Sequence, residues 1–467
     1  MYFLLKGGLM QKSIILTEGS ITKKLVALAI PIMGTSFIQM AYNMTDMIWI
    51  GKIGSNAVAA IGTAGFFTWL AMAFIMISKV GAEVKVAQSI GEHKYKAAKS
   101  YATTAIQINL FFAFIYGLLL IIFRKPLLDF FRLGDVNIVN MAEVYLVVMA
   151  LGMIFYFINP VFTSIFNATG DSKTPFLINT IGLIFNIVFD PLLIFGVGPF
   201  PRMEVLGAAI ATVMAQVVVS IFFIIALKNR KEEFFKINIF SKPDKDNIIS
   251  IFKLGLPVGS QSGLFTIFSI LLARIISKFG PIPIAVQKVG SQIEAISWMT
   301  AGGFSTALCS FIGQNYGAKK YDRVIKGYKA TMILATILGI FTTALLIFGG
   351  KFIFSLFISE KEVVEYGVTY LRILAYSQLF MCIEITTTGA FNGLGKTAIP
   401  SIISIVLTGL RVPAAFILSS ENLLGLNGVW WSVSMSSVFK GILMTGIFII
   451  MLRLNKLFGK NLESVSN

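Results

Sequence analysis

Long apolar stretches recur along the chain between short polar or Gly/Pro-rich breaks. Each stretch has about 20 residues or more, the length that an α-helix needs to cross the hydrocarbon core of a membrane. The pattern predicts an all-α polytopic membrane protein with twelve transmembrane helices. The predicted spans are 25–50, 57–77, 101–123, 142–162, 175–195, 206–227, 248–276, 284–312, 327–348, 368–390, 399–418 and 426–452.

The composition excludes an ordinary soluble protein. Hydrophobic residues make up 56% of the 467 residues and charged residues only 13%, whereas a soluble chain carries about 25% charge. The net charge of +17 would suggest nucleic acid in a soluble domain, but in a polytopic membrane protein it more often reflects basic cytoplasmic loops.

The distribution of Lys and Arg separates these two interpretations. With twelve spans both termini lie on one side, and the segments on that side hold 25 Lys and Arg against 8 in the opposite segments. Basic residues next to short loops are retained in the cytoplasm. We therefore expect a multi-pass protein of the cytoplasmic (inner) membrane with both termini in the cytoplasm, and no nucleic-acid partner.

The N-terminus and the cysteines add little. No cleaved signal peptide is recognisable, and Met10 is an alternative to Met1 as the first residue. Cys309 and Cys382 both fall inside apolar segments, which argues against a disulfide framework.

The chain repeats itself with an offset of 225 or 226 residues. Pro31 matches Pro257, and the stretch 167–175 matches 392–400, with Gly170 over Gly395. A further set matches at the same offset: Gln88, Gly91, Lys94 and Tyr95 with Gln314, Gly317, Lys320 and Tyr321. Six spans per repeat is an even number, so the two halves share their orientation in the membrane.

The repeat predicts two six-helix lobes. The predicted segments are a cytoplasmic N-terminal segment 1–24, an N-lobe 25–227, a cytoplasmic linker 228–247, a C-lobe 248–452 and a cytoplasmic tail 453–467. Two repeats of like orientation suit a transporter that works by alternating access. A channel is disfavoured because no ring-forming filter motif is present.

Polar residues inside spans are functional candidates because burying them in lipid is costly. In the first span Gln39, Asn43 and Asp46 share one helical face, and in the fifth span Asn179, Asn186 and Asp190 do the same. Two stripes that each end in a carboxylate predict a hydrated cavity in the N-lobe. The alternative is that Asp46 or Asp190 is a solvated residue at the membrane boundary.

Two coupling ions fit these residues. Burial and a second carboxylate nearby raise the pKa of an aspartate toward neutral pH, so that it exchanges protons. Alternatively Asp46, Asp190, the Asn186 amide and the Thr212 hydroxyl form an oxygen-rich site that accepts Na+. The residues alone do not decide between H+ and Na+.

In the second half, Glu384 and Arg411 are the isolated intramembrane charges of most interest. They either pair within the bundle or contact a substrate or ion. Other charges in the spans are interpreted as pairing or interfacial residues: Glu294, Lys288, Arg274, Arg372 and Lys440.

The sequence offers no assembled catalytic site. His93 is the only histidine, which excludes His-based metal sites and triads, and no phosphate-binding Gly-x-x-x-x-Gly-Lys-Ser/Thr loop occurs. We therefore expect neither an enzyme nor a bound cofactor.

Several motifs resemble those of the multidrug and toxic compound extrusion (MATE) family, in order along nearly the whole chain. They are Leu16-Thr-Glu-Gly-Ser-Ile21, Pro31, Asp46 followed by Trp49-Ile-Gly-Lys-Ile-Gly54, Gln314-Asn-Tyr-Gly317, Asn392-Gly-Leu-Gly395 and Arg411-Val-Pro413. The resemblance implies a two-lobed MATE fold and an antiporter that exports organic cations or other amphipathic compounds in exchange for H+ or Na+.

The resemblance also implies roles for single residues. Asp46 matches the first-helix aspartate of the family, while Asn186 and Asp190 match a pair in its DinF-like branch and Thr212 the helix-six hydroxyl. Gln39 and Tyr42 lie where that branch lines its drug cavity. Pro31 lies where the first helix bends, so that protonation of the aspartates would kink this helix and displace the drug.

The chain departs from the NorM-like branch of the family. Where that branch has a glutamate in the seventh helix, residues 257–266 contain none and offer Gln261. Glu384 lies only near the tenth-helix aspartate of that branch. The resemblance therefore favours the DinF-like branch and a coupling site in the N-lobe, with Gln261 and Glu384 left as lining of the substrate cavity.

The sequence thus predicts a monomeric multidrug exporter whose partners are small amphipathic molecules and the lipid bilayer. The alternative is a flippase for lipid-linked precursors from the same broad superfamily. Such a flippase should have a cationic cavity for its anionic lipid carriers, whereas the polar stripes of this chain carry aspartates.

Overall fold

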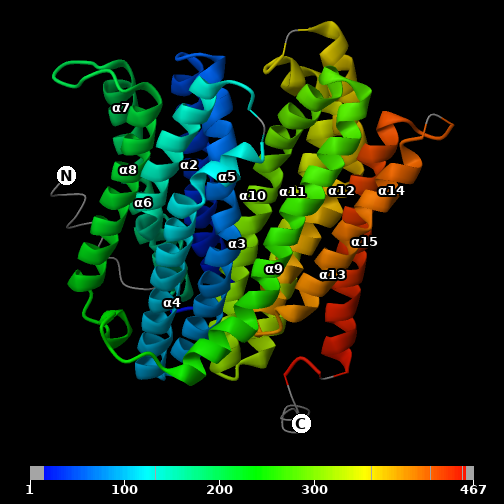
Figure 1. The fold of residues 1–467 in the computed structure, drawn as a ribbon. Coiled ribbons are helices and arrows are strands. Elements are labelled where there is room, and N and C mark those ends of the chain that lie inside the picture. Colours follow the sequence, from blue (N-terminus) through cyan, green and yellow to red (C-terminus); the bar gives the residue numbers. More distant parts are fainter. Residues whose placement is uncertain (1–14, 132, 359, 421, 455, 459–467) are drawn as a thin grey trace. The chain divides into compact units, whose positions relative to one another are not determined.

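The computed structural model describes residues 15–131, 133–358, 360–420, 422–454 and 456–458. It is 85% helical, and the described residues contain no strand and twelve helices long and apolar enough to cross a membrane (Figure 1). The predicted all-α fold with twelve spans is confirmed. Met1 and Met10 lie outside the described residues, as do parts of the predicted segments 1–24 and 453–467.

The helices begin and end as follows. The first half contains α2 (Ile21–Gly51), α3 (Ser55–Gly91), α4 (Tyr95–Ile122), α5 (Arg124–Asp129), α6 (Val136–Ala168), α7 (Lys173–Phe195), α8 (Glu204–Asn229) and the 3-10 turn η1 (Glu233–Phe235). The second half contains α9 (Lys245–Ile276), η2 (Ser277–Phe279), α10 (Pro281–Gly317), α11 (Tyr321–Ser355), α12 (Lys361–Gly393), α13 (Ala398–Gly409), α14 (Arg411–Leu418) and α15 (Leu426–Arg453).

The internal repeat is visible in the helices themselves. Helices α3 and α10 each have 37 residues, and α6 and α12 each have 33. The fifth span of the repeat differs between the halves. It is the continuous helix α7 in the first half, but in the second half it is divided into α13 and α14 at Leu410.

The turns that end equivalent helices also repeat. After α6, Gly170 has φ +87°, and after α12 Gly395 has φ +74°. In both turns the glycine N–H donates to an asparagine carbonyl three residues earlier, at 2.9 Å from Asn167 and 2.8 Å from Asn392. Glycine is favoured here because a left-handed backbone is strained for residues with a Cβ. The Asn-x-x-Gly motif is therefore a helix stop.

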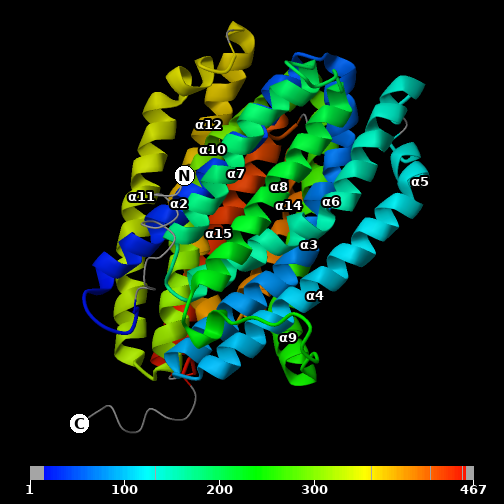
Figure 2. The same cartoon turned by 90° about the vertical axis from the view of Figure 1, so that its left-hand side faces the viewer.

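Packing divides the chain into two compact units. Unit 1 contains residues 30–259, and unit 2 contains residues 16–29 and 260 onward. In unit 1, α6 is central and packs against α3, α4 and α8, while α7 packs against α8. The short α5 packs against α4 and α6 at the turn that joins them (Figure 2).

Unit 2 repeats this plan with α12 at its centre. Helix α12 packs against α10, α11 and α15, and both α13 and α14 pack against α15 (Figure 1). The core around α12 contains Tyr370 and Trp430, whose rings meet edge to face with centroids 5.3 Å apart. Large apolar side chains such as Phe348 are exposed, as expected where a helix faces acyl chains.

The first residues of unit 2 are clamped by α10 and α11. The Arg323 guanidinium donates to the backbone carbonyls of Leu16, Glu18 and Gly19 at 3.0–3.2 Å. The Asn315 amide donates to the Leu16 carbonyl at 3.2 Å. Residues 16–19 are thus fixed by side chains about 300 positions later in the chain.

The predicted linker 228–247 is packed against unit 1. The Arg230 guanidinium forms a buried ion pair with Asp171 and lies over the Phe235 ring at 5.5 Å. The Gln107 amide donates to the carbonyls of Ile239 and Ser241 at 2.9 and 2.8 Å. These contacts explain why unit 1 continues past the linker and why the division of the chain falls inside α9, between Gly259 and Ser260.

Glycines allow the first half of α9 to pack closely on α3. A Cβ at Gly255 would lie 1.7 Å from the Ile77 carbonyl oxygen, and one at Gly259 would lie 2.7 Å from the Ala73 carbonyl oxygen. A Cβ on Gly81 would meet Ile251 in the same way, at 2.7 Å. The two backbones are therefore closer than residues with side chains permit.

We expect Gly255→Ala to destabilise unit 1, because the new methyl group would force α3 and α9 apart. Overpacking of this kind costs about 1–3 kcal/mol. The measurement is the melting temperature of the purified protein in detergent. Gly62→Ala is the matched control, since nothing lies within 4 Å of a Cβ at Gly62, and it should not lower the melting temperature. Equal losses in both variants would contradict the packing argument.

Candidate functional site

Four predicted coupling residues come together in unit 1 from three helices. The Asn186 amide on α7 donates to Asp190 Oδ1 one turn later, at 3.0 Å. The carboxyl group of Asp46 on α2 lies within interaction range of Asp190, Asn186 and the Thr212 hydroxyl on α8. Residues separated by up to 166 positions in the sequence thus form one polar cluster.

The cluster has more acceptors than donors. Asn186, Asp190 and Thr212 are buried, with exposures of 0%, 1% and 7%. Three buried oxygens find no hydrogen-bond partner among the described residues: Asp46 Oδ1, Asn186 Oδ1 and Asp190 Oδ2. The burial of Asp190 distinguishes it from a solvated boundary residue. An unsatisfied buried acceptor costs about 1–3 kcal/mol, so the cluster gains stability from any cation that these oxygens bind.

The donor set suits a proton or a small monovalent cation. Two facing carboxylates can share one proton, because two like charges in a buried site repel each other. The carboxylate, amide and hydroxyl oxygens are also the hard ligands that Na+ prefers. Both ions predicted from the sequence therefore fit the residues that the structure brings together.

Two tyrosines complete this region. The Tyr42 hydroxyl donates to the Thr212 backbone carbonyl at 3.4 Å, which ties α2 to α8 beside the cluster. Tyr145 on α6 is buried within electrostatic range of both Asp46 and Asp190. Tyr145 was not predicted from the sequence, because a lone aromatic residue in an apolar span has the same pattern as a core residue.

The other members of the two polar stripes lie elsewhere. Gln39 and Asn43 are exposed on α2. The Asn179 amide donates to the Pro175 carbonyl of its own helix at 2.7 Å. The stripes therefore meet only at their carboxylate ends. Pro31 lies within α2, where its carbonyl accepts the Thr35 hydroxyl at 3.0 Å.

Unit 2 holds a separate charged cluster. Lys440 on α15 forms an ion pair with Glu384 Oε1 on α12 at 3.0 Å, and both side chains are about nine-tenths buried, with exposures of 10% and 8%. The Ser404 hydroxyl also donates to Glu384 Oε1, at 3.4 Å. Pairing of Glu384 within the bundle was one of the two sequence interpretations, but its partner is Lys440 and not Arg411.

Arg411 makes a different set of contacts. It is the first residue of α14, and its guanidinium donates to the hydroxyls of Ser436 and Ser437 on α15 at 2.9 and 3.0 Å. Glu294 on α10 lies within electrostatic range of this guanidinium, and its Oε1 has no hydrogen-bond partner among the described residues. Of the remaining span charges, Lys288, Arg274 and Arg372 are exposed.

Gln261 lines a small cavity in unit 2. The cavity has a volume of about 130 Å³. Its lining residues come from α9, α13 and α15 and are Gln261, Phe265, Phe268, Ser404, Ile405, Thr408 and Lys440. Glu384, which was predicted together with Gln261 as cavity lining, is not among these residues but contacts two of them, Ser404 and Lys440.

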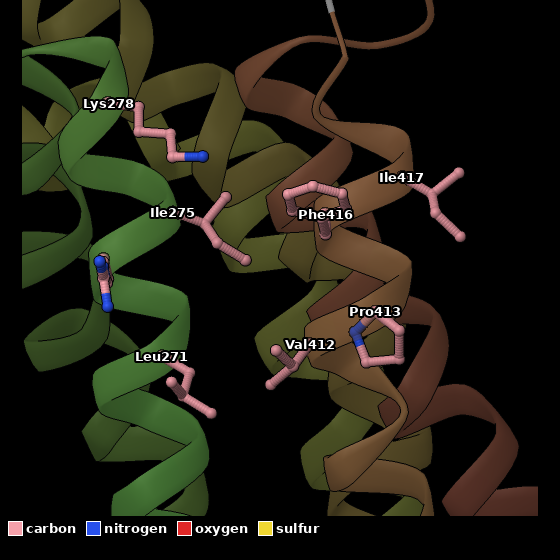
Figure 3. Close-up of a pocket in the computed structure, with 8 residues that line it drawn as sticks. Leu271, Ile275, Lys278, Val412, Pro413, Phe416 and Ile417 are labelled. Carbon is pink, nitrogen blue, oxygen red and sulfur yellow. The ribbon is translucent and has the colours of Figure 1, made fainter.

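A larger groove of about 570 Å³ lies between α9 and α14. Figure 3 shows Leu271 and Ile275 on one side and Val412, Pro413 and Phe416 on the other. Leu271 and Phe416 are exposed, so this groove belongs to the apolar outer surface of unit 2.

Comparisons of the sequence and of the structure with known proteins agree on one family of relatives. The MatE protein-family model matches residues 31–192 and 257–417, more than half of the chain. A protein of Thermotoga maritima named "Probable multidrug resistance protein NorM" is 27% identical over 425 residues, which cover 91% of this chain and 91% of that protein.

Solved structures agree with the family match. One is described as the outward-facing conformation of a multidrug resistance MATE family transporter of the MOP superfamily. It is 25% identical with a TM-score of 0.84, covering 96% of this chain and 99% of that chain. A MOP superfamily transporter from Pyrococcus furiosus, described as having a binding pocket of reverse polarity that suggests a different function, has the same identity, TM-score and coverage.

We expect Lys440→Met to destabilise the protein more than Lys440→Met combined with Glu384→Gln. Removing one partner of a buried ion pair leaves an uncompensated charge and costs about 3–5 kcal/mol, whereas replacing both partners is often nearly neutral. Melting temperatures in detergent would measure the difference. Arg202→Met is the control, because its ion pair with Glu204 is exposed and such pairs contribute about 0–1 kcal/mol. A double variant less stable than Lys440→Met would contradict the assignment of the pair.

Proposed function

This chain belongs to the MatE family of multidrug and toxic compound extrusion (MATE) proteins, and on that basis we propose that it is a cation-coupled antiporter. It exports amphipathic organic cations and other drugs in exchange for H+ or Na+. The names of its relatives support export of drugs as the cargo, and the twelve candidate spans support a multi-pass membrane location.

One observation carries the coupling proposal. Unit 1 buries the carboxylates of Asp46 and Asp190 together, and acceptor oxygens of both lack partners among the described residues. Within the described part of the chain no Lys or Arg interacts with this pair, in contrast to Glu384 in unit 2. The pair therefore has a high affinity for a cation from outside the chain, as a coupling site requires.

Coupling follows from where the ligands lie. Asp46 is on α2, whereas Asn186 and Asp190 are on α7 and Thr212 is on α8. A proton or Na+ shared among them draws α2 toward α7 and α8, and its release lets the carboxylates repel each other. Pro31 lacks the backbone N–H that would continue the helical hydrogen bonds, so α2 bends most easily at that point. A bend of α2 then alters the drug cavity that the sequence predicts in the N-lobe.

We assign the change of access to movement of one repeat against the other, the usual device of transporters built from internal repeats. The pair Asn186 and Asp190, together with the lack of a carboxylate in residues 257–266, supports the DinF-like branch of the family. We further propose that the protein acts as a monomer in the cytoplasmic membrane, with both termini in the cytoplasm.

The second candidate is a flippase for lipid-linked precursors. Buried Lys440 and Arg411 favour it, because an anionic lipid carrier needs cationic partners. The unpaired carboxylates of unit 1 favour the antiporter, since a flippase for anions gains nothing from them. We therefore rank the antiporter first.

Efflux of ethidium from proteoliposomes under an imposed pH gradient or Na+ gradient tests the proposal. We expect one gradient to drive efflux in the wild type and Asp190→Asn to abolish the gradient-driven part, because the amide cannot accept the proton or hold the charge of Na+. Asp135→Asn is the matched control. Asp135 is the N-cap of α6, where it accepts the Asn137 N–H at 2.8 Å, and asparagine caps helices equally well.

Two results would contradict the proposal. If neither gradient moves ethidium in the wild type, the antiporter is wrong and the flippase becomes the better hypothesis. If Asp190→Asn transports as well as Asp135→Asn, coupling does not depend on this cluster. Glu384 would then be the next residue to substitute.

A further inference from the structure

The groove of about 570 Å³ on the outer surface of unit 2 has two apolar walls. Leu271 and Ile275 lie one turn apart on α9, and Val412 and Phe416 lie one turn apart on α14. Figure 3 shows these side chains on the two sides of the groove. Leu271 is 40% exposed and Phe416 is 65% exposed. In a helix that crosses a membrane, such side chains contact acyl chains, so lipid and not water covers this groove.

The division of the fifth span in unit 2 places α14 beside this groove. Helix α14 begins at Arg411, directly after the end of α13, and it packs against α13 and α15. The side chains of Val412 and Phe416 face α9 across the groove and do not fill it (Figure 3). A space of this kind between two apolar helices suits a flexible hydrocarbon chain.

One end of the groove carries positive charge. Arg274 lies in the last turn of α9 and Lys278 one turn later in η2, and both line the groove. The Lys278 ammonium lies 5.5 Å from the centroid of the Phe416 ring, so it reaches from α9 toward α14 (Figure 3). No acidic residue is among the lining residues, and neither cation has an ion pair within the described ranges.

We propose that this groove binds an anionic phospholipid, with one acyl chain between α9 and α14 and the phosphate at Arg274 and Lys278. A guanidinium matches phosphate oxygens with two parallel hydrogen bonds, and an ammonium adds a second charge. Basic pockets between transmembrane helices bind anionic headgroups in this way.

The order of the residues along α9 agrees with the orientation of a lipid. Both cations lie at the end of the span, where headgroups are found, and Leu271 lies about 10 Å deeper along the helix axis than Lys278. The acyl chain thus runs from the cations toward Leu271. On the topology proposed above, this end of α9 faces away from the cytoplasm, so the lipid belongs to the outer leaflet.

Two general roles would also account for cations at this position. Basic residues near the C-terminus of a helix interact favourably with its dipole, and long basic side chains extend to the headgroup region of any lipid. Neither role distinguishes one phospholipid from another. Preference for an anionic headgroup is therefore the property that tests the proposal.

Native mass spectrometry of the full-length protein in detergent measures this preference. The protein is titrated with dioleoyl-phosphatidylglycerol, which is anionic, and with dioleoyl-phosphatidylcholine, which has the same acyl chains and no net charge. The ratio of the two Kd values for the first bound lipid is compared between variants. A loss of structure that weakens both lipids alike cancels in this ratio.

The main variant combines Arg274→Gln with Lys278→Gln. We expect it to lower the preference for phosphatidylglycerol at least about tenfold, because each basic residue near a lipid headgroup contributes to its attraction. The matched control combines Lys351→Gln with Lys361→Gln. These residues are exposed cations at the same end of the unit 2 helices, outside the groove, and their removal should leave the ratio unchanged.

Leu271→Trp provides a second variant that keeps both cations and fills the deep part of the groove. We expect it to weaken binding of phosphatidylglycerol a few-fold, because the indole ring occupies the place of the acyl chain. Leu345→Trp on α11 is its control, since Leu345 is 41% exposed and lies outside the groove. Equal binding by these two variants would show that the acyl chain does not occupy the groove and would overturn the proposal.

Two further results would also overturn it. One is equal binding of both lipids by the wild type, and the other is an equal loss of preference in the two charge variants, which would indicate general surface charge. The readout is lipid binding and not transport. Failure of the lipid site therefore leaves the proposed antiport standing, and absence of ethidium efflux leaves the lipid site standing.

Discussion

A charge buried in a membrane-spanning helix has to be neutralised by something close to it, and the two units of this protein meet that requirement differently. In unit 2 the chain supplies the counter-ion itself, since Lys440 lies 3.0 Å from Glu384. In unit 1 the residues that the structure describes supply none, and oxygens of Asp46 and Asp190 find no partner among them. The first arrangement is self-contained, whereas the second is the one to which we assign the proposed coupling ion.

The difference between the paired carboxylate of unit 2 and the unpaired carboxylates of unit 1 arises within a scaffold that is the same in both units. Both units are built around the equivalent helix, α6 or α12, and both end that helix with the same Asn-x-x-Gly turn. Duplication gave two similar frames, and substitutions inside them gave one frame an acidic cluster and the other a paired one. The break between α13 and α14, where α7 is continuous, belongs to the same divergence and places Arg411 in the interior of unit 2.

The sequence was sufficient to predict the twelve spans and the repeat. Apolar stretches and repeated motifs can be recognised without knowing which helices are in contact. The sequence was also sufficient to select Asp46 and Asp190, which the structure brings together, because a carboxylate in an apolar span is conspicuous. The sequence did not reveal the role of Tyr145, because its pattern is that of a core residue. It also did not reveal the partner of Glu384, because Lys440 is 56 positions away and was one of several isolated charges. The sequence also did not show that α9 is divided between the units. The glycines that let its first half pack on α3 form no distinctive sequence pattern, and their role is visible only in the contacts with α3.

The clamp on residues 16–19 has a consequence for biosynthesis. Its donors, Asn315 and Arg323, follow Leu16 in the chain by 299 and 307 residues. At about 5–20 residues per second, the ribosome reaches them roughly 15–60 s after it has made the segment they hold. The start of the first helix is therefore inserted long before its binding surface exists. During that interval the carbonyls of residues 16–19 lack the donors that hold them in the folded protein.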